Sequence, residues 1–259
     1  MSFYLILFVF GAVIGSFLNV CIYRIPRNQS IIWPASRCTS CGNPINFYDN
    51  VPIFSYFLLR GRCRSCKAKI SGRYPLVEAL NAFFYLLVFW RYGLAWSSAI
   101  YFVFCSALIV ITFIDYDFQI IPDRITLPGI PIGLVAGSFI LPDPFLRATS
   151  LGLIASVIGA AAGFSFFYLV AFLSLRILKK EGMGGGDIKL LAMIGAFVGW
   201  RGTLATIFFG ALLGAIGGIL AMRKGGEGLK TAIPFGPYLC VAALGARYLG
   251  CVFWSWILI

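Results

Sequence analysis

The sequence predicts an all-α protein that crosses a membrane about eight times and carries a small zinc-stabilised domain between its first two membrane helices. Three observations lead to this fold class. Hydrophobic residues make up 60% of the chain and charged residues 12%, which is about half the charge of an ordinary soluble domain. Apolar windows near the length of a membrane-spanning helix recur along the sequence. Four of the eight cysteines form two close pairs in one basic loop.

Eight apolar windows predict transmembrane helices, because a backbone in lipid must satisfy its own hydrogen bonds. They are residues 3–23, 75–91, 95–114, 126–141, 151–175, 188–200, 202–221 and 235–258. The sixth window is too short to span a bilayer comfortably unless it begins below the surface. No basic residue precedes the first window and no small-residue cleavage site follows it. We therefore expect a retained helix there, and not a secretory leader.

Basic residues predict the orientation of the helices, because cytoplasmic loops carry an excess of Lys and Arg. The first long loop holds Arg24, Arg27, Arg37, Arg60, Arg62, Arg64, Lys67, Lys69 and Arg73. Later inner joints hold Arg124, Arg176, Lys179, Lys180, Lys189, Arg223, Lys224 and Lys230, whereas outer joints hold only Arg91, Arg147 and Arg201. We expect the N-terminus outside and the long loop in the cytoplasm. Topology then explains most of the +12 net charge, and no nucleic-acid partner is expected.

The chain contains no histidine, which excludes several kinds of catalysis. Ser-His-Asp and Cys-His catalysis, His-ligated zinc proteases and histidine proton relays all need that residue. A general base must then be a carboxylate, a lysine, a cysteine or a tyrosine. Four of the nine acids fall at predicted cytoplasmic helix ends: Asp115, Asp117, Asp123 and Asp187. This clustering favours carboxylate chemistry at that face of the membrane.

The loop after the first helix contains Cys38-x-x-Cys41 and Cys63-x-x-Cys66, with 21 residues between the pairs. This spacing is typical of a tetrahedral four-cysteine zinc site. The predicted cytoplasmic location argues against the alternative of two disulfides, and unligated thiols are the other alternative. Four protein ligands leave no open position, so the zinc would be structural and would supply folding free energy to a loop too short for a large core.

Two residues of this region have both a ligand-binding and a structural interpretation. Gly61, in "LLRGRC", would let a backbone approach a ligand closely, but a turn into the second cysteine pair explains it equally well. Glu78, in "RYPLVEAL", lies in the first turns of the second helix, where the helix dipole favours an acid. The basic residues around them could equally be contacts to anionic lipid headgroups.

Two acid-bearing segments are expected to meet near the cytoplasmic face. In "FIDYDFQIIPD" Asp115 ends a long apolar helix, at the negative end of the dipole, where a carboxylate is disfavoured unless it has another use. Asp117 and Asp123 have ordinary explanations as a solvated turn residue and a helix start. Asp187 begins the sixth window after "GMGGG". Two carboxylates around one water would form an aspartic-protease dyad, in which repulsion leaves one protonated and one ionised.

The glycine run before Asp187 has a use in such a site. Gly184, Gly185 and Gly186 carry no side chains, so an extended substrate strand could come close and the helix start could adjust after the substrate binds.

The segment "GMGGGDIKLLAMIGAFVGW" contains the Gly-x-Gly-Asp motif of intramembrane aspartyl proteases, and its flanks resemble bacterial type IV prepilin peptidases. The resemblance extends over nearly the whole chain, through "FLNVCIYRIP", the paired cysteines, "LRGRCRSCKAKISGRYPLVEAL", "DYDFQIIPD" and "IPFGPYLCVAAL". One departure is Tyr116, where leucine is common.

This resemblance implies an enzyme of the bacterial inner membrane that cuts the leader from prepilins or pseudopilins, after a glycine, on the cytoplasmic side. It also implies methylation of the new N-terminal amine by S-adenosylmethionine. Asp115 and Asp187 would be the catalytic pair, although the choice of Asp115 over Asp117 rests partly on the resemblance. The four paired cysteines would bind zinc. Gly61 and Glu78 are the candidates for the methyl-donor site, since no glycine-rich nucleotide-binding strand and helix are visible.

The resulting domain plan is a first transmembrane helix at 1–23, a cytoplasmic zinc domain at 24–73 and a membrane-embedded protease core at 74–259. An ion-coupled transporter is the alternative function, because broken helices with membrane acids also occur in transporters. It would place the acids near the bilayer midplane and show an inverted repeat, neither of which is seen. A zinc-organised membrane scaffold without chemistry is a third possibility, and the sequence indicates no oligomeric state.

Overall fold

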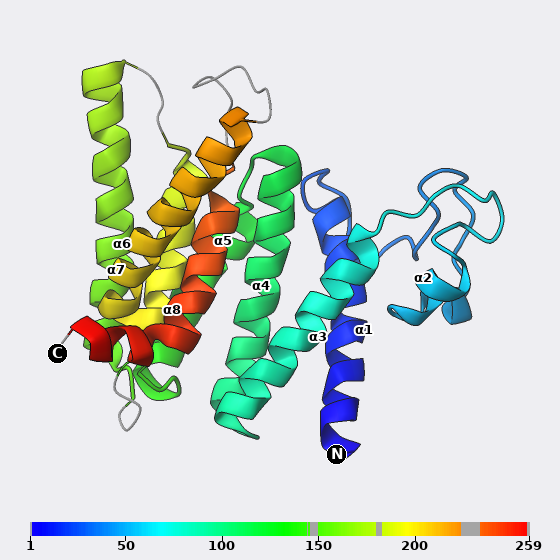
Figure 1. The fold of residues 1–259 in the computed structure, drawn as a ribbon, viewed down its shortest axis with the longest axis horizontal. Coiled ribbons are helices and arrows are strands. Elements are labelled where there is room, and N and C mark those ends of the chain that lie inside the picture. Colours follow the sequence, from blue (N-terminus) through cyan, green and yellow to red (C-terminus); the bar gives the residue numbers. More distant parts are fainter. Residues whose placement is uncertain (1, 144, 146–149, 180–182, 224–233, 258–259) are drawn as a thin grey trace. The chain divides into compact units, whose positions relative to one another are not determined.

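The structure is a computed structural model that describes residues 2–143, 145, 150–179, 183–223 and 234–257. The described residues are helical apart from loops and three isolated β-bridges, as the predicted all-α class requires. In chain order (Figure 1), the helices are α1 Ser2–Arg24, η1 Phe47–Asn50, α2 Phe54–Leu58, α3 Arg73–Tyr92, α4 Trp96–Phe118, α5 Asp123–Phe139, α6 Leu153–Leu173, η2 Ser174–Leu178, α7 Gly185–Arg223 and α8 Gly236–Ile257.

Contacts divide the chain into two compact units. Unit 1 is Met1–Val110 and unit 2 is Ile111–Ile259, so the boundary falls within α4. Unit 1 holds the cysteine pairs, and unit 2 holds the acids Asp115 and Asp187. The domain boundaries predicted after residues 23 and 73 lie inside unit 1 and stay predictions.

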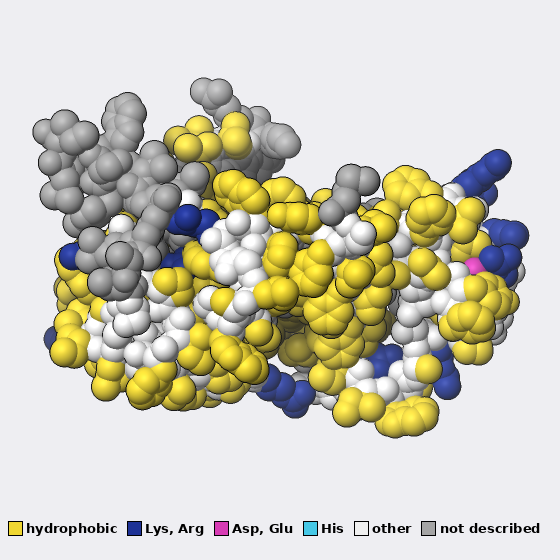
Figure 2. Space-filling view, turned by 90° about the horizontal axis from the view of Figure 1, so that it is seen from below, with side chains coloured by type: hydrophobic (Ala, Val, Ile, Leu, Met, Phe, Trp, Pro, Cys, Tyr) yellow, Lys and Arg dark blue, Asp and Glu magenta, His cyan; other side chains and the backbone are white. Residues whose placement is uncertain are grey.

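Four of the described helices are long and apolar enough to cross a membrane. They are Ser2–Arg24, Trp96–Phe118, Leu153–Ile177 and Gly185–Leu220. Figure 2 shows hydrophobic side chains over much of the visible surface, and on α1 the side chains of Leu5 and Ile6 are about two-thirds exposed. Such apolar surfaces suit contact with lipid. The prediction of eight spans and of their orientation stays a prediction, and Arg147, Lys180, Lys224 and Lys230 lie outside the described residues.

In unit 1, α1 packs closely against α3 through two glycines spaced four residues apart. A Cβ on Gly11 would lie 2.7 Å from the Cα of Ala82, and one on Gly15 would lie 2.6 Å from the Cα of Glu78. Asn81 donates a 2.7 Å hydrogen bond to the Gly11 carbonyl. Small residues allow this approach between membrane helices, and the hydrogen bond adds to it where no water competes.

In unit 2, the predicted sixth and seventh windows are two halves of α7. They meet at Gly199, whose φ of 71° is not helical and suits glycine. In the first half, Gly195 contacts Gly159 of α6. In the second half, a Cβ on Gly210 would lie 3.0 Å from the side chain of Leu239 of α8. A straight helix of 39 residues would be about 58 Å long, which is nearly twice the thickness of a membrane core.

Candidate functional site

The four paired cysteines converge in unit 1, as their spacing predicts. Their sulfur atoms all lie within 4.8 Å of one another, and the sulfurs of Cys38 and Cys66 are 3.8 Å apart. Zinc–sulfur bonds of about 2.3 Å in a tetrahedron separate the sulfurs by about 3.8 Å. The cluster therefore has the dimensions of a four-thiolate metal site.

The two cysteine pairs have the same backbone geometry. In each pair the first cysteine accepts one backbone hydrogen bond and donates another, and the residue after the second cysteine has positive φ. The hydrogen bonds are Gly42 N–H to Cys38 O, Cys38 N–H to Asn43 O, Lys67 N–H to Cys63 O and Cys63 N–H to Ala68 O, all 2.9 to 3.0 Å long. The positive φ values are 72° at Gly42 and 59° at Lys67. Each tight turn directs both sulfurs of its pair toward one point.

The electrostatics of the cluster also fit a cation. Hydrogen bonds from the amides of Cys41 and Ser40 lower the pKa of the Cys38 thiol to about 6. The Ala68 amide lowers the pKa of Cys66, but loss of solvent and the three neighbouring sulfurs outweigh it and raise this pKa to about 11. The thiols thus resist ionising together on their own. A bound soft metal ion would remove that repulsion, because thiolates are its preferred ligands.

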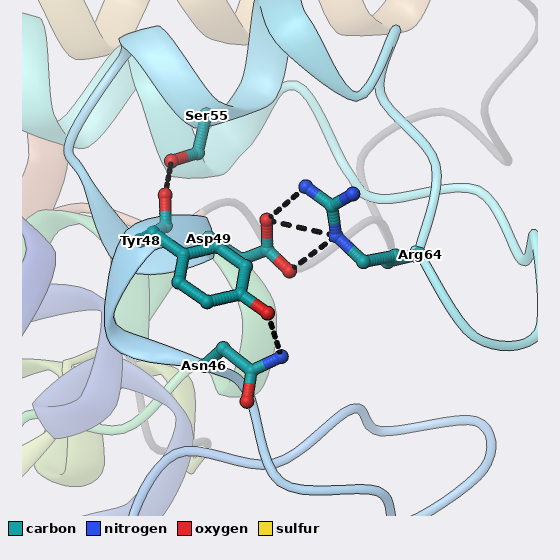
Figure 3. Close-up of polar contacts among 5 residues, drawn as sticks. All are labelled: Asn46, Tyr48, Asp49, Ser55 and Arg64. Atoms are coloured by element: carbon teal, nitrogen blue, oxygen red, sulfur yellow. Dashed lines mark hydrogen bonds and ion pairs between the residues drawn. The ribbon is translucent and has the colours of Figure 1, made fainter.

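A polar network supports the second cysteine pair (Figure 3). Arg64, between Cys63 and Cys66, forms a two-pronged ion pair with Asp49 of η1, with contacts of 2.8 Å from Nε and 2.7 Å from Nη2. This pairing lowers the pKa of Asp49, whose side chain is 9% exposed. Ser55 of α2 donates to the Tyr48 carbonyl at 3.2 Å. The network connects the cysteine cluster to both short helices of the loop.

Gly61 and Glu78 both have structural partners. Gly61 has φ of 65°, and a Cβ there would lie 3.1 Å from the ring of Tyr56. Glu78 is 7% exposed, and its Oε2 accepts a 2.7 Å hydrogen bond from the backbone N–H of Ile53. Ile53 has a φ of 63°, which is strained for a β-branched residue. Glu78 therefore anchors the loop between α1 and α3 on α3, at a strained turn.

Asp115 and Asp187 come together in unit 2. Asp115 lies in the last turn of α4 and is 5% exposed, whereas Asp117, two residues on, is exposed. Asp187 lies in the first turn of α7 and is close enough to Asp115 for the two carboxylates to interact electrostatically. The buried side chain of Cys240 is within electrostatic range of both. Two acids from helix ends that are far apart in the sequence thus lie close together at a partly buried site.

Gly236 is a site residue that the sequence reasoning missed. Its backbone N–H, in the first turn of α8, donates a 2.9 Å hydrogen bond to Oδ2 of Asp115. A Cβ on Gly236 would lie only 2.7 Å from the same oxygen, so the close approach requires glycine. The available signal was a glycine between Phe235 and Pro237, at a position typical of a helix start. The positive end of α8 therefore faces Asp115.

The three glycines of the motif differ in their surroundings. A Cβ on Gly186 would lie 2.8 Å from that of Ile121, so Gly186 packs against the segment that joins α4 to α5. A Cβ on Gly184 would lie 3.5 Å from Oδ2 of Asp187, and one on Gly185 would meet no described residue within 4 Å. Gly184 thus lies directly beside the Asp187 carboxylate.

A long-range ion pair holds the same region together. Nζ of Lys189, in the first turns of α7, lies 2.7 and 2.8 Å from the two carboxylate oxygens of Asp123, the first residue of α5. Asp123 is thus a helix start, as predicted, and it also fixes the beginning of α7 next to that of α5.

Comparisons with known proteins cover most of the chain. Residues 9–92 match the family described as Bacterial Peptidase A24 N-terminal domain, and residues 102–219 match the Type IV leader peptidase family. A prepilin leader peptidase/N-methyltransferase of Pseudomonas putida is 38% identical over 90% of this chain and 86% of its own length. A protein with the same name from Myxococcus xanthus is 38% identical over 85% of this chain and 64% of its own length. Another, from Pseudomonas aeruginosa, is 36% identical over 93% of this chain and 89% of its own length. No solved structure matches the chain at a significant level.

Proposed function

Because the chain belongs to the type IV leader peptidase family, we propose that it cleaves the leader of prepilins or pseudopilins and methylates the new N-terminal residue with S-adenosylmethionine. The main structural support for cleavage is the proximity of Asp115 and Asp187. The methylation follows from the names of the relatives. The comparisons give the alternative of an ion-coupled transporter no support.

Cleavage proceeds by water attack between the two carboxylates. The ionised member takes a proton from the water as its oxygen attacks the scissile carbonyl carbon, and the protonated member donates its proton to the carbonyl oxygen. The tetrahedral intermediate then returns its hydroxyl proton to the second carboxylate, and the C–N bond breaks as the leaving amine takes the proton that the first carboxylate had removed from water. The Gly236 N–H and the positive end of α8 stabilise a negative charge on Asp115, so Asp115 is the base and Asp187 the acid.

The glycine motif admits the substrate. The substrate backbone around the scissile bond must be extended and free of neighbouring side chains to lie between two carboxylates. The open space at Gly185 and the approach of Gly184 to Asp187 provide such a path. With the basic loop in the cytoplasm, Asp115 and Asp187 lie at the cytoplasmic ends of their helices, in a bacterial inner membrane with the N-terminus outside.

Cys38, Cys41, Cys63 and Cys66 would hold a zinc ion. Four thiolates at these separations close the coordination sphere, so the metal would contribute folding free energy and no catalysis. Glu78 and the Arg64–Asp49 pair then connect this folded loop to α3 and η1.

The proposed cleavage has a direct test. The purified full chain in detergent is incubated with a synthetic prepilin, and the products are identified by mass spectrometry. We expect one cut, after the last glycine of the leader. An intact substrate, under conditions in which a relative such as the Pseudomonas putida enzyme cuts it, would reject the proposal.

Loss of the metal should affect methylation and spare cleavage. In Cys41→Ser, three ligands remain, the loop loses its main source of folding free energy, and bound zinc should fall from about one ion per chain to nearly none. Methylation of a cleaved pilin should fall at least tenfold. Cleavage should be spared, because the loop belongs to the other unit from Asp115 and Asp187. Zinc is measured by elemental mass spectrometry. Cys21→Ala, at a buried lone cysteine of α1, is the control and should keep zinc and both activities. Equal zinc in the two variants would reject the metal site.

A further inference from the structure

The short helix α2 exposes its apolar side chains and buries a polar one. Phe54, Phe57 and Leu58 have the spacing of neighbours on one side of a helix, and each is more than two-thirds exposed. Ser55, which lies away from them, is buried and donates its hydrogen bond within the loop, to the Tyr48 carbonyl. A helix beside water has the reverse arrangement. We call the side chains of Phe54, Phe57 and Leu58 the α2 face.

Two contacts place the start of α2 beside the middle of α1. The backbone N–H of Ile53 donates to Oε2 of Glu78, and a Cβ on Gly15 of α1 would lie 2.6 Å from the Cα of the same Glu78. Gly15 is nine residues before Arg24, the last residue of α1, so it lies about 14 Å along the helix from that end. Since α1 is long and apolar enough to cross a membrane, the loop folds back beside it to a level at which α1 would be in lipid.

The backbone around α2 suits contact with lipid. Because lipid offers no hydrogen bonds, an amide there needs an acceptor within the protein. Ile53 donates to the Glu78 carboxylate at 2.7 Å. The N–H groups of Ser55, Leu59 and Gly61 donate to backbone carbonyls at 2.8 to 3.0 Å. The segment thus exposes apolar side chains while these amides are satisfied.

Basic side chains follow α2 directly. Arg60 and Arg62 are exposed. Long basic side chains near lipid extend toward the headgroups, where anionic phosphates attract them. Tyr48, which precedes α2, is half exposed, and tyrosine is frequent at the boundary between lipid and water. An apolar face followed by two arginines therefore matches the acyl chains and phosphates of a phospholipid leaflet.

We propose that α2 is inserted into one leaflet of the membrane, with the α2 face among phospholipid acyl chains and with Arg60 and Arg62 at the phosphate groups. This leaflet is the one next to Arg24, which is the cytoplasmic leaflet in the proposed orientation. The part of the basic loop around α2 then lies in the membrane and not in the cytoplasm. The inference is independent of the enzymatic function, because it depends only on contacts within unit 1.

Photolabelling of the unmodified chain tests this placement. The full chain is reconstituted in vesicles of phosphatidylethanolamine and phosphatidylglycerol that contain a phospholipid with a diazirine in its acyl chain. After illumination and proteolysis, mass spectrometry locates the lipid adducts. Val9 of α1, which is 53% exposed, is the reference in lipid, and Gln29, which is exposed beyond the end of α1, is the reference in water. We expect adducts on the α2 face, as on Val9, at least tenfold more often than on Gln29. A smaller ratio for the α2 face would overturn the insertion.

Phe57→Glu and Gln29→Glu are a matched pair of variants for the same label. A carboxylate among acyl chains is unfavourable, so Phe57→Glu should lower the labelling of Phe54 and Leu58 at least threefold. Gln29→Glu should change it less than twofold. Equal labelling of the two variants would contradict a location in lipid.

The same label separates lipid from a protein partner. The unmodified chain is illuminated with and without an excess of a synthetic prepilin. We expect the adducts on the α2 face to persist. Their loss on addition of the prepilin would assign the α2 face to the substrate and overturn lipid as its partner.

Discussion

Replacing Asp187 with Asn should lower the rate of leader cleavage by about 10²–10⁴-fold or more, because the amide cannot donate an acid proton to the carbonyl oxygen. Asp115→Asn should have a loss of the same order, since it removes the base. Single-turnover cleavage of a synthetic prepilin, followed by mass spectrometry, measures both.

Asp117→Asn is the matched control for that prediction. Asp117 lies on the same helix end as Asp115, but its side chain is exposed. Its substitution should leave cleavage within about threefold of the wild type. A severe loss in Asp117→Asn with full activity in Asp115→Asn would move the catalytic role by two residues and contradict the assignment.

Replacing Gly236 with Ala should lower cleavage about 10²-fold. The new Cβ would lie 2.7 Å from Oδ2 of Asp115, so the carboxylate or the start of α8 must move, and a displacement near 1 Å costs about that factor. The N–H that now holds Asp115 at 2.9 Å would move with it. The cleavage rate at saturating substrate is the measurement, because it reports on the chemical step.

Gly245→Ala provides the control on the same helix. A Cβ at Gly245 meets no described residue within 4 Å, so the substitution should keep the wild-type rate and stabilise α8 by up to about 1 kcal/mol. Equal cleavage rates in Gly236→Ala and Gly245→Ala would show that the contact with Asp115 has no catalytic role.

Local patterns predict much of this molecule. Each apolar window falls on a helix within the described residues, because the length of the membrane core constrains helix and window alike. The two Cys-x-x-Cys pairs meet as their spacing predicts, because each tight turn is complete within a few residues. The junction at Gly199 was placed within a residue or two, since the windows end at 200 and resume at 202.

Long-range contacts account for what the sequence could not predict. Gly236 and Asp115 are 121 residues apart, and Lys189 and Asp123 are 66 apart, so neither pair leaves a signal in periodicity or local composition. A cavity of about 1230 Å³ in unit 1 is lined by α1, the start of α3 and the loop between them, and that loop has little regular structure of its own. Glu78 could be interpreted as a helix-start acid, but its bond to Ile53 depends on that same loop.

The proposed function assigns cleavage of the leader to Asp115 and Asp187 in unit 2, and methylation of a cleaved pilin does not depend on that pair. The most direct test gives Asp187→Asn two substrates in separate reactions with S-adenosylmethionine, an intact prepilin and the same pilin already cleaved, and weighs the products by mass spectrometry. The account predicts an unchanged prepilin and a cleaved pilin that gains the mass of one methyl group at its N-terminal residue. Removal of the leader from the intact prepilin by this variant at the wild-type rate would contradict it.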